Sequence, residues 1–140
     1  MNGDRVFLDS NVLIYLFDSS AAAKQKRAQA LLQEFGASIV ISTQVLLEFY
    51  VNVTRKLAPP LSIDAAESAV GEFSTLEVVV IEMPLVRAAI TLSREHGLSL
   101  WDALIVESAR ARGCRRLLSE DLQHGREFGS MRVENPFRSG

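Results

Sequence analysis

The sequence predicts an α/β domain built on a mainly parallel sheet. Short runs of β-branched and apolar residues alternate with longer stretches of helical periodicity, the pattern of strands joined by crossover helices. The length of 140 residues suits one compact domain, expected to span residues 1–140. Hydrophobic residues make up 48% of the chain, enough apolar surface to form a core and to exclude a generally disordered chain.

The first part of the chain predicts two strands and two helices. An apolar run at residues 6–8 predicts the first strand, and residues 19–35, rich in Ala, Gln, Lys and Leu, predict a helix that Gly36 stops. Residues 38–41 predict the second strand, and residues 43–57 carry apolar side chains at helical spacing. The following Ala-Pro-Pro is expected to be a turn between helices.

The remainder predicts three more helices and up to three strands. We expect helices at residues 62–73, 84–96 and 100–112, the last two ended by glycines. Residues 78–81 are all apolar, which predicts a strand buried on both faces. A fourth strand is expected at residues 116–118 and a short fifth strand at residues 131–133.

Composition excludes several classes of protein. A single cysteine, Cys114, rules out a disulfide framework and a cysteine-based zinc site. The longest uncharged apolar stretch, residues 12–17, is far shorter than a membrane span, and the N-terminus has no signal-peptide pattern. We therefore expect a soluble, cytoplasmic protein with no membrane association.

Charge gives little information about partners. The formal net charge is -2, but residues 110–140 carry seven arginines and only four acids. Such a region is suited to phosphate contact through the forked arginine side chain. On charge alone, a solvated surface is the favoured interpretation.

Four carboxylates stand where a ligand site is expected. Asp9 directly follows the first strand and Asp121 follows the fourth, while Glu48 and Asp102 lie in predicted helices. In parallel α/β sheets the ligand crevice lies beyond the carboxyl ends of the strands. The four acids are therefore predicted to converge there.

Each acid also has a purely structural interpretation. Asp9 is a possible helix cap, Asp121 a possible turn residue and Glu48 a possible solvated helix residue. Asp102, three residues after Ser99, fits a capping box.

Convergence of these acids predicts a cation. Neighbouring carboxylates repel one another, and hard oxygen ligands select Mg²⁺ or Mn²⁺. Such a site suits metal-assisted phosphodiester hydrolysis, which needs no histidine base. We expect structural roles for His96 and His124 and a core position for Cys114. The chain has no glycine-rich phosphate loop, no GxGxxG and no serine nucleophile elbow, which disfavours nucleotide-cofactor enzymes.

Four segments, in order, resemble the PIN domain family, specifically the VapC-like ribonuclease toxins of type II toxin–antitoxin systems. They are FLDSNVL (7–13), STQVLLEF (42–49), LSLWDALI (98–105) and LLSEDLQHG (117–125). The resemblance extends from Val6 to about Pro136 and implies a three-layer α/β/α sandwich around a central, mainly parallel sheet of four or five strands. It also implies an acidic quartet of Asp9, Glu48, Asp102 and Asp121.

The resemblance assigns roles within that quartet. Asp9 and Asp102 are the expected direct ligands of Mg²⁺ (or Mn²⁺), with Glu48 and Asp121 acting directly or through water. Ser10 and Asn11 are expected to shape the loop of the first acid, and Ser119 stands where the family often has Thr or Ser. The neighbouring Glu120 and Glu107 are not expected to be ligands.

The function predicted is that of a metal-dependent endoribonuclease, in which metal-activated water attacks RNA in line at phosphorus. The candidate backbone-contacting residues are Arg112, Arg115, Arg116 and Arg126. One alternative is a non-catalytic RNA-binding or scaffold member of the same fold. An aspartate-nucleophile phosphatase is a poorer alternative, because position 11 is Asn11 and no lysine follows Lys56.

The resemblance also implies partners. Family members usually form homodimers and are neutralised by a small antitoxin that wraps the toxin's helices and inserts a basic side chain at the acidic site. The apolar stretch at residues 12–17 and the helix after Ser19 are candidate parts of that groove. A position in the core is at least as good an interpretation of the same apolar residues.

Overall fold

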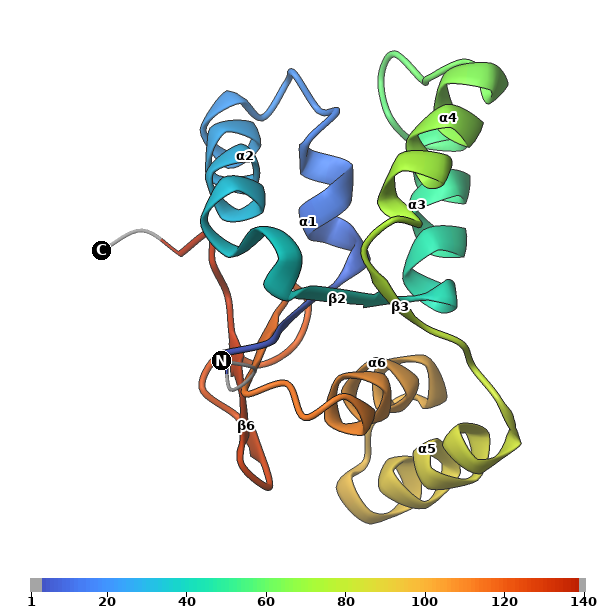
Figure 1. The fold of residues 1–140 in the computed structure, drawn as a ribbon, viewed down its shortest axis with the longest axis vertical. Coiled ribbons are helices and arrows are strands. Elements are labelled where there is room, and N and C mark those ends of the chain that lie inside the picture. The colour runs from blue at the N-terminus through green and yellow to red at the C-terminus, as the bar shows by residue number, and fades with distance from the viewer. Residues whose placement is uncertain (1–3, 139–140) are drawn as a thin grey trace.

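The computed structural model describes residues 4–138, which form a six-stranded sheet with helices on both faces (Figure 1). The predicted three-layer α/β/α architecture is confirmed. The strand order is β3-β2-β1-β4-β6-β5, and every neighbouring pair except β5 and β6 is parallel. The elements in chain order are β1 (Val6–Leu8), α1 (Ser10–Tyr15), α2 (Ala22–Phe35), a 3-10 turn (Gly36–Ser38), β2 (Ile39–Ser42), α3 (Thr43–Arg55), α4 (Ile63–Phe73), β3 (Glu77–Val79), α5 (Met83–His96), α6 (Leu100–Ala111), β4 (Arg116–Leu118), β5 (Glu127–Phe128) and β6 (Met131–Glu134).

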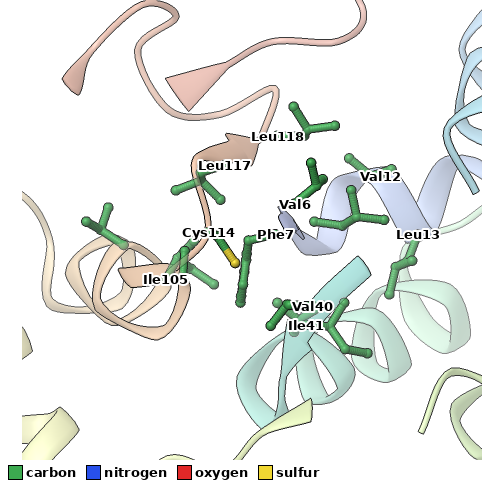
Figure 2. Packing of buried hydrophobic residues seen from close by; sticks show 14 of the residues in the cluster. Val6, Phe7, Val12, Leu13, Val40, Ile41, Ile105, Cys114, Leu117 and Leu118 are labelled. Carbon is green, nitrogen blue, oxygen red and sulfur yellow. The ribbon is translucent and has the colours of Figure 1, made fainter. Parts of the chain in front are cut away.

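The core is densest around β1, the strand that lies between β2 and β4. All three of its residues are buried, because helices cover both faces of the sheet at this point. Helices α1 to α4 lie on one side and α5 and α6 on the other (Figure 1). Figure 2 shows Phe7 of β1 beside Cys114, with Ile105 of α6 close by. Burial raises the pKa of the Cys114 thiol to about 12, so this cysteine is the inert core residue that the sequence predicts.

Two short elements were not predicted from the sequence. Helix α1 has only six residues, and in the sequence it shows only as part of the apolar stretch at residues 12–17. Strand β5 has two residues and pairs antiparallel with β6 across a two-residue turn. Gly129 has a φ of +63° in that turn, which glycine adopts without the steric cost that other residues meet. Neither element is long enough to show a hydrophobic period.

The prediction for the third strand was partly wrong. Strand β3 lies at the edge of the sheet and pairs only with β2, and Val80, just beyond its end, is largely exposed. An all-apolar run therefore does not mark a strand buried on both faces here. The reason is that the run continues past the strand into a connection that the helices leave uncovered.

The chain order places a topological switch point between β1 and β4. From β1 the sheet grows outward through β2 and β3, and from β4 it grows the opposite way through β6 and β5. The connections leaving β1 and β4 therefore diverge, which opens a crevice at the carboxyl ends of these two strands. Among residues 4–138, no helix has the length and apolar character needed to cross a membrane.

Candidate metal-dependent active site

The four predicted acids line a single cavity at the switch point. Asp9 follows β1 and Asp121 follows β4, while Glu48 comes from α3 and Asp102 from the first turn of α6. Figure 1 shows α3 and α6 on opposite sides of the sheet, so the two helices bring their acids from opposite faces. The cavity has a volume of about 420 Å³. The predicted convergence of the four carboxylates is what the structure shows.

Asp9 is the most buried of these acids. Its Oδ1 accepts a hydrogen bond from the Ser10 amide at 2.7 Å, and its Oδ2 accepts one from Ser119 Oγ at 2.7 Å. Burial raises the pKa of Asp9 to about 7, against the lowering effect of these two bonds, and the charges of Glu48 and Asp121 raise it further. The site therefore holds more negative charge than its environment stabilises, which favours a cation.

Ser119 connects the ends of β1 and β4. It is fully buried, and its hydroxyl oxygen also accepts hydrogen bonds from the amides of Asp121 (3.1 Å) and Leu122 (3.3 Å). One side chain thus fixes the Asp9 carboxylate and the backbone that carries Asp121. The expectation that Ser119 orients an acid is consistent with this geometry.

Asn11 makes a second connection between the same loops. Its Nδ2 donates to Asp121 Oδ2 at 3.2 Å, and its Oδ1 accepts from the Glu120 amide at 3.2 Å. In an aspartate-nucleophile phosphatase, a second acid is expected two residues after the nucleophile. Here that position is Asn11, whose amide holds the loop after β4. This placement gives the phosphatase alternative no support.

Glu48 is held by one residue that the sequence indicated and one that it did not. Ser10 Oγ donates to Glu48 Oε1 at 3.0 Å, and Gln44 Nε2 donates to Glu48 Oε2 at 3.0 Å. The same Gln44 nitrogen also lies 3.2 Å from the backbone oxygen of Trp101. Gln44 therefore links α3 to the first turn of α6, directly beside Asp102. Its spacing from Glu48, one helical turn, was the only available signal.

Asp102 combines the two interpretations that the sequence left open. Ser99 caps α6 by accepting a hydrogen bond from the Asp102 amide at 3.1 Å, as the capping pattern predicts. The Asp102 carboxylate nevertheless lines the cavity, and within residues 4–138 it accepts no hydrogen bond. Its oxygens are thus available to a ligand.

The donor set fits a hard divalent cation that keeps part of its water shell. Within residues 4–138, no three or more His, Cys, Asp or Glu side chains are grouped so that they could hold a metal ion. Mg²⁺ typically binds through only one or two carboxylates together with waters and substrate phosphates, so it does not require such a group. Four carboxylates around one cavity, including the buried Asp9, match that requirement.

The other acids and the histidines lie outside the cavity lining. Glu120 pairs with Lys24 and accepts from the Tyr15 hydroxyl; partial burial acts to raise its pKa, but these two partners lower it overall. Glu107 pairs with Arg110 at 3.4 Å. His124 Nδ1 accepts from the Asn135 amide, a structural role. Neither Glu107 nor Glu120 is among the residues that line the cavity.

The four arginines predicted to contact RNA are not brought to the cavity. Arg116 begins β4 and Arg112 and Arg115 precede it, so these three lie toward the amino ends of the strands, opposite the acids. Arg112 pairs with Glu77 at 2.9 Å. Arg126 stacks on Phe128. The basic residue that lines the cavity is Lys56, at the end of α3, which the sequence did not single out.

The predicted antitoxin groove is also largely core. Val12 and Leu13 are fully buried, and the Phe17 ring packs against Phe49 and Phe73. For these residues the core interpretation, which the sequence left open beside the groove, is the one that the structure shows. Exposed apolar side chains occur instead on α3 and α4, where a groove is lined by Leu46, Leu47, Tyr50 and Val70.

Asp9 is expected to make stability fall as pH rises, when divalent metal is absent. The unfolded chain loses this proton near pH 3.8, whereas the native protein keeps it to about pH 7. Between these values the native state binds more protons, so its free energy of unfolding should fall by about 3–5 kcal/mol in total. Chemical denaturation in EDTA from pH 4 to 8 measures this fall. The same series on Asp9→Asn isolates the contribution of Asp9 to this fall. If the free energy of unfolding changed with pH in the same way in both proteins, the raised pKa of Asp9 would be contradicted.

Ser119→Ala is expected to lower both stability and activity. It removes the donor to buried Asp9 and the acceptor of two backbone amides, so the free energy of unfolding should fall by about 1–3 kcal/mol. Loss of a group that orients a ligand typically costs about 10–100-fold in activity. Ser119→Thr keeps the hydroxyl and should restore activity. Wild-type cleavage rates in Ser119→Ala would exclude this positioning role.

The sequence matches the PIN domain family over residues 6–126. No curated protein matches it. The fold is similar to that of a toxin–antitoxin complex from Klebsiella pneumoniae, with a TM-score of 0.73, 19% identity and coverage of 96% of this chain and 99% of that chain.

Two further solved structures have the same fold. The Mycobacterium tuberculosis toxin VapC20, which cleaves the sarcin–ricin loop, has a TM-score of 0.67 at 19% identity, covering 80% of this chain and 86% of that one. The DNA-bound VapBC complex from Salmonella typhimurium has a TM-score of 0.67 at 19% identity, covering 95% and 98%. At this level of identity, these similarities establish the fold.

Proposed function

The chain belongs to the PIN domain family, and we propose that it is a divalent-metal-dependent endoribonuclease, the toxin of a toxin–antitoxin pair. The observation that carries the proposal is the convergence of Asp9, Glu48, Asp102 and Asp121 on one cavity at the switch point of the sheet. Among the described residues, none of these four carboxylates forms an ion pair with a basic side chain, which leaves them available to a cation.

The proposed assignment gives each acid a role. Asp9 and Asp102 would hold Mg²⁺ or Mn²⁺, with Glu48 and Asp121 contributing directly or through water. When bound, the metal would lower the pKa of a water molecule and offset negative charge at the phosphate.

The residues of the chain then organise the reaction. Glu48, fixed by Ser10 and Gln44, is placed to orient the attacking water by accepting a hydrogen bond from it. Ser119 and Asn11 keep Asp9 and Asp121 at the mouth of the same cavity, so the site does not have to assemble when RNA arrives. Lys56 is placed to contact a neighbouring phosphate of the RNA backbone.

Two protein partners belong to the proposal. The fold is that of toxins solved in toxin–antitoxin complexes, which supports an antitoxin for this chain. A homodimer is proposed from the family resemblance.

RNA cleavage by the purified protein tests the proposal. Wild type and Asp9→Asn are incubated with labelled total RNA in Mg²⁺, Mn²⁺ or EDTA. Discrete cuts by wild type alone, abolished by EDTA, are expected. Equal background cleavage in both proteins would instead support the alternative of a non-catalytic RNA-binding or scaffold domain.

A further inference from the structure

One wall of the acidic cavity is apolar. Leu47 and Val51 of α3 and Ile105 of α6 line it together with the four acids. Leu47 is 69% exposed, so this wall opens to solvent rather than into the core. The cavity therefore joins two kinds of surface. Its carboxylate end suits a cation, which in turn can bind a phosphate, and its apolar side suits neither group.

Trp101 lies next to this apolar wall along α6, although it is not among the residues that line the cavity. It lies four residues before Ile105 on α6, and residues at this spacing occupy the same face of a helix. Side chains on a helix lean toward its N-terminus, so we expect the Trp101 side chain on the N-terminal side of Ile105. The residue is 63% exposed although it is the largest apolar side chain of the protein.

The position of Trp101 is tied to the acids. Gln44 Nε2 contacts its backbone oxygen and also Glu48 Oε2, and the next residue is Asp102. The backbone of Trp101 is thus fixed to the side chain that holds Glu48, in the same turn that presents Asp102. Its exposed ring is therefore available to a ligand that reaches the acids.

An unpaired nucleotide has the matching chemistry. Its phosphate is anionic and its base presents a flat apolar face, and aromatic side chains bind single-stranded nucleic acid by stacking on such faces. Lys56 adds a positive charge on the α3 side of the cavity for an adjacent phosphate. Paired bases are already stacked within a duplex, so their faces are not available to this ring.

We propose that Trp101 is a stacking platform for an unpaired RNA base beside the phosphate that is cut. This proposal rests on the ribonuclease function proposed above and adds to it a residue that positions the substrate. The ring holds an unpaired base next to the cut, so affinity for the strand depends partly on this side chain and not only on the acids.

The test measures binding separately from cleavage. Because Trp101 is the single tryptophan, tryptophan fluorescence of wild type reports on this ring alone. The affinities of all variants are measured by the anisotropy of a fluorescent label on the RNA. In EDTA, a labelled oligoadenylate single strand, the same strand without bases and the duplexed strand are titrated with wild type, Trp101→Phe and Trp101→Ala. Ile63→Ala is the matched control, because Ile63 is 65% exposed and does not line the cavity. Cleavage of the single strand in Mg²⁺ is followed for the same proteins.

Stacking predicts a specific pattern. The single strand should quench the fluorescence of Trp101, and Trp101→Ala should weaken its binding by roughly 5- to 100-fold, the range measured for loss of one stacked base. Trp101→Phe should retain most of the affinity, and Ile63→Ala should bind as wild type. The strand without bases should bind wild type and Trp101→Ala equally.

Three other results would overturn the proposal. If wild type cleaves RNA but Trp101→Ala binds and cleaves equally well, stacking is wrong while the ribonuclease proposal stands. If wild type neither binds nor cleaves any RNA, both proposals fail. If Trp101 emission is blue-shifted before RNA is added and shifts to the red on dilution, a second copy of the chain covers the ring, and the surface is a protein interface.

Discussion

Asp9→Asn is expected to abolish RNA cleavage and at the same time to stabilise the protein at neutral pH. Asp9 is the buried carboxylate that lines the acidic cavity, and it accepts hydrogen bonds from Ser119 and the Ser10 amide. Its replacement should reduce cleavage by more than about 100-fold, because losing groups that merely orient a ligand already costs about 10–100-fold. A gel assay with labelled RNA in Mg²⁺ measures the rate.

The stabilisation comes from removing the charge of the buried Asp9 carboxylate. The native environment raises the pKa of Asp9 to about 7, so above that pH the protein holds a charge that it stabilises poorly. The amide removes this charge and keeps nearly the same shape, so Asp9→Asn should have the higher free energy of unfolding at pH 8 in EDTA. The control is Asp64→Asn, which changes an acid of the first turn of α4 outside the cavity and should alter neither property appreciably. An active Asp9→Asn would remove the assignment.

Divalent metal is expected to stabilise the wild-type protein strongly. A ligand that binds only the native state at 100 times its Kd raises the free energy of unfolding by about 2.7 kcal/mol, roughly 10 °C in Tm for a domain of this size. The effect should grow from pH 6 to pH 8, because the metal binds the ionised form of Asp9 and competes with its proton. Thermal melts with Mg²⁺ or Mn²⁺ against EDTA measure this shift.

The acid variants serve as controls for that experiment. Asp9→Asn and Asp102→Asn each remove a proposed ligand and should lose most of the shift, whereas Glu107→Gln, outside the cavity, should keep it. Equal shifts in all of these proteins would mean that the metal binds elsewhere. The melts require no RNA, so they test the metal site independently of the unknown substrate.

Local patterns were sufficient to predict most of the fold. The apolar run at β1 and the helical period of α3 each extend over enough residues to identify the element. Capping by Ser62 and Ser99 was visible as well, because a cap depends on residues only a few positions apart. Elements without such local signals, α1 and β5, were not predicted.

The edge position of β3 could not be predicted from its composition. Its apolar run resembles that of a central strand, but exposure depends on which strands and helices lie beside it. The same limit affected the stretch at residues 12–17, whose apolar side chains suit both a groove and a core. The sequence shows which residues are apolar, while tertiary packing decides which neighbours each of them contacts.

For the site, the sequence by itself determined the acids and their order, because Asp9 and Asp121 directly follow strands whose carboxyl ends share one edge. Only the tertiary structure decided what surrounds them. Gln44 and Trp101 are 57 residues apart in the chain, and their contact joins α3 to α6. Arg112, Arg115 and Arg116 lie toward the amino ends of the strands, away from the acids, because of the direction in which β4 runs through the sheet. Distance along the chain does not specify distance in space, so the residues that support the acids become visible only when the sheet brings separate helices together.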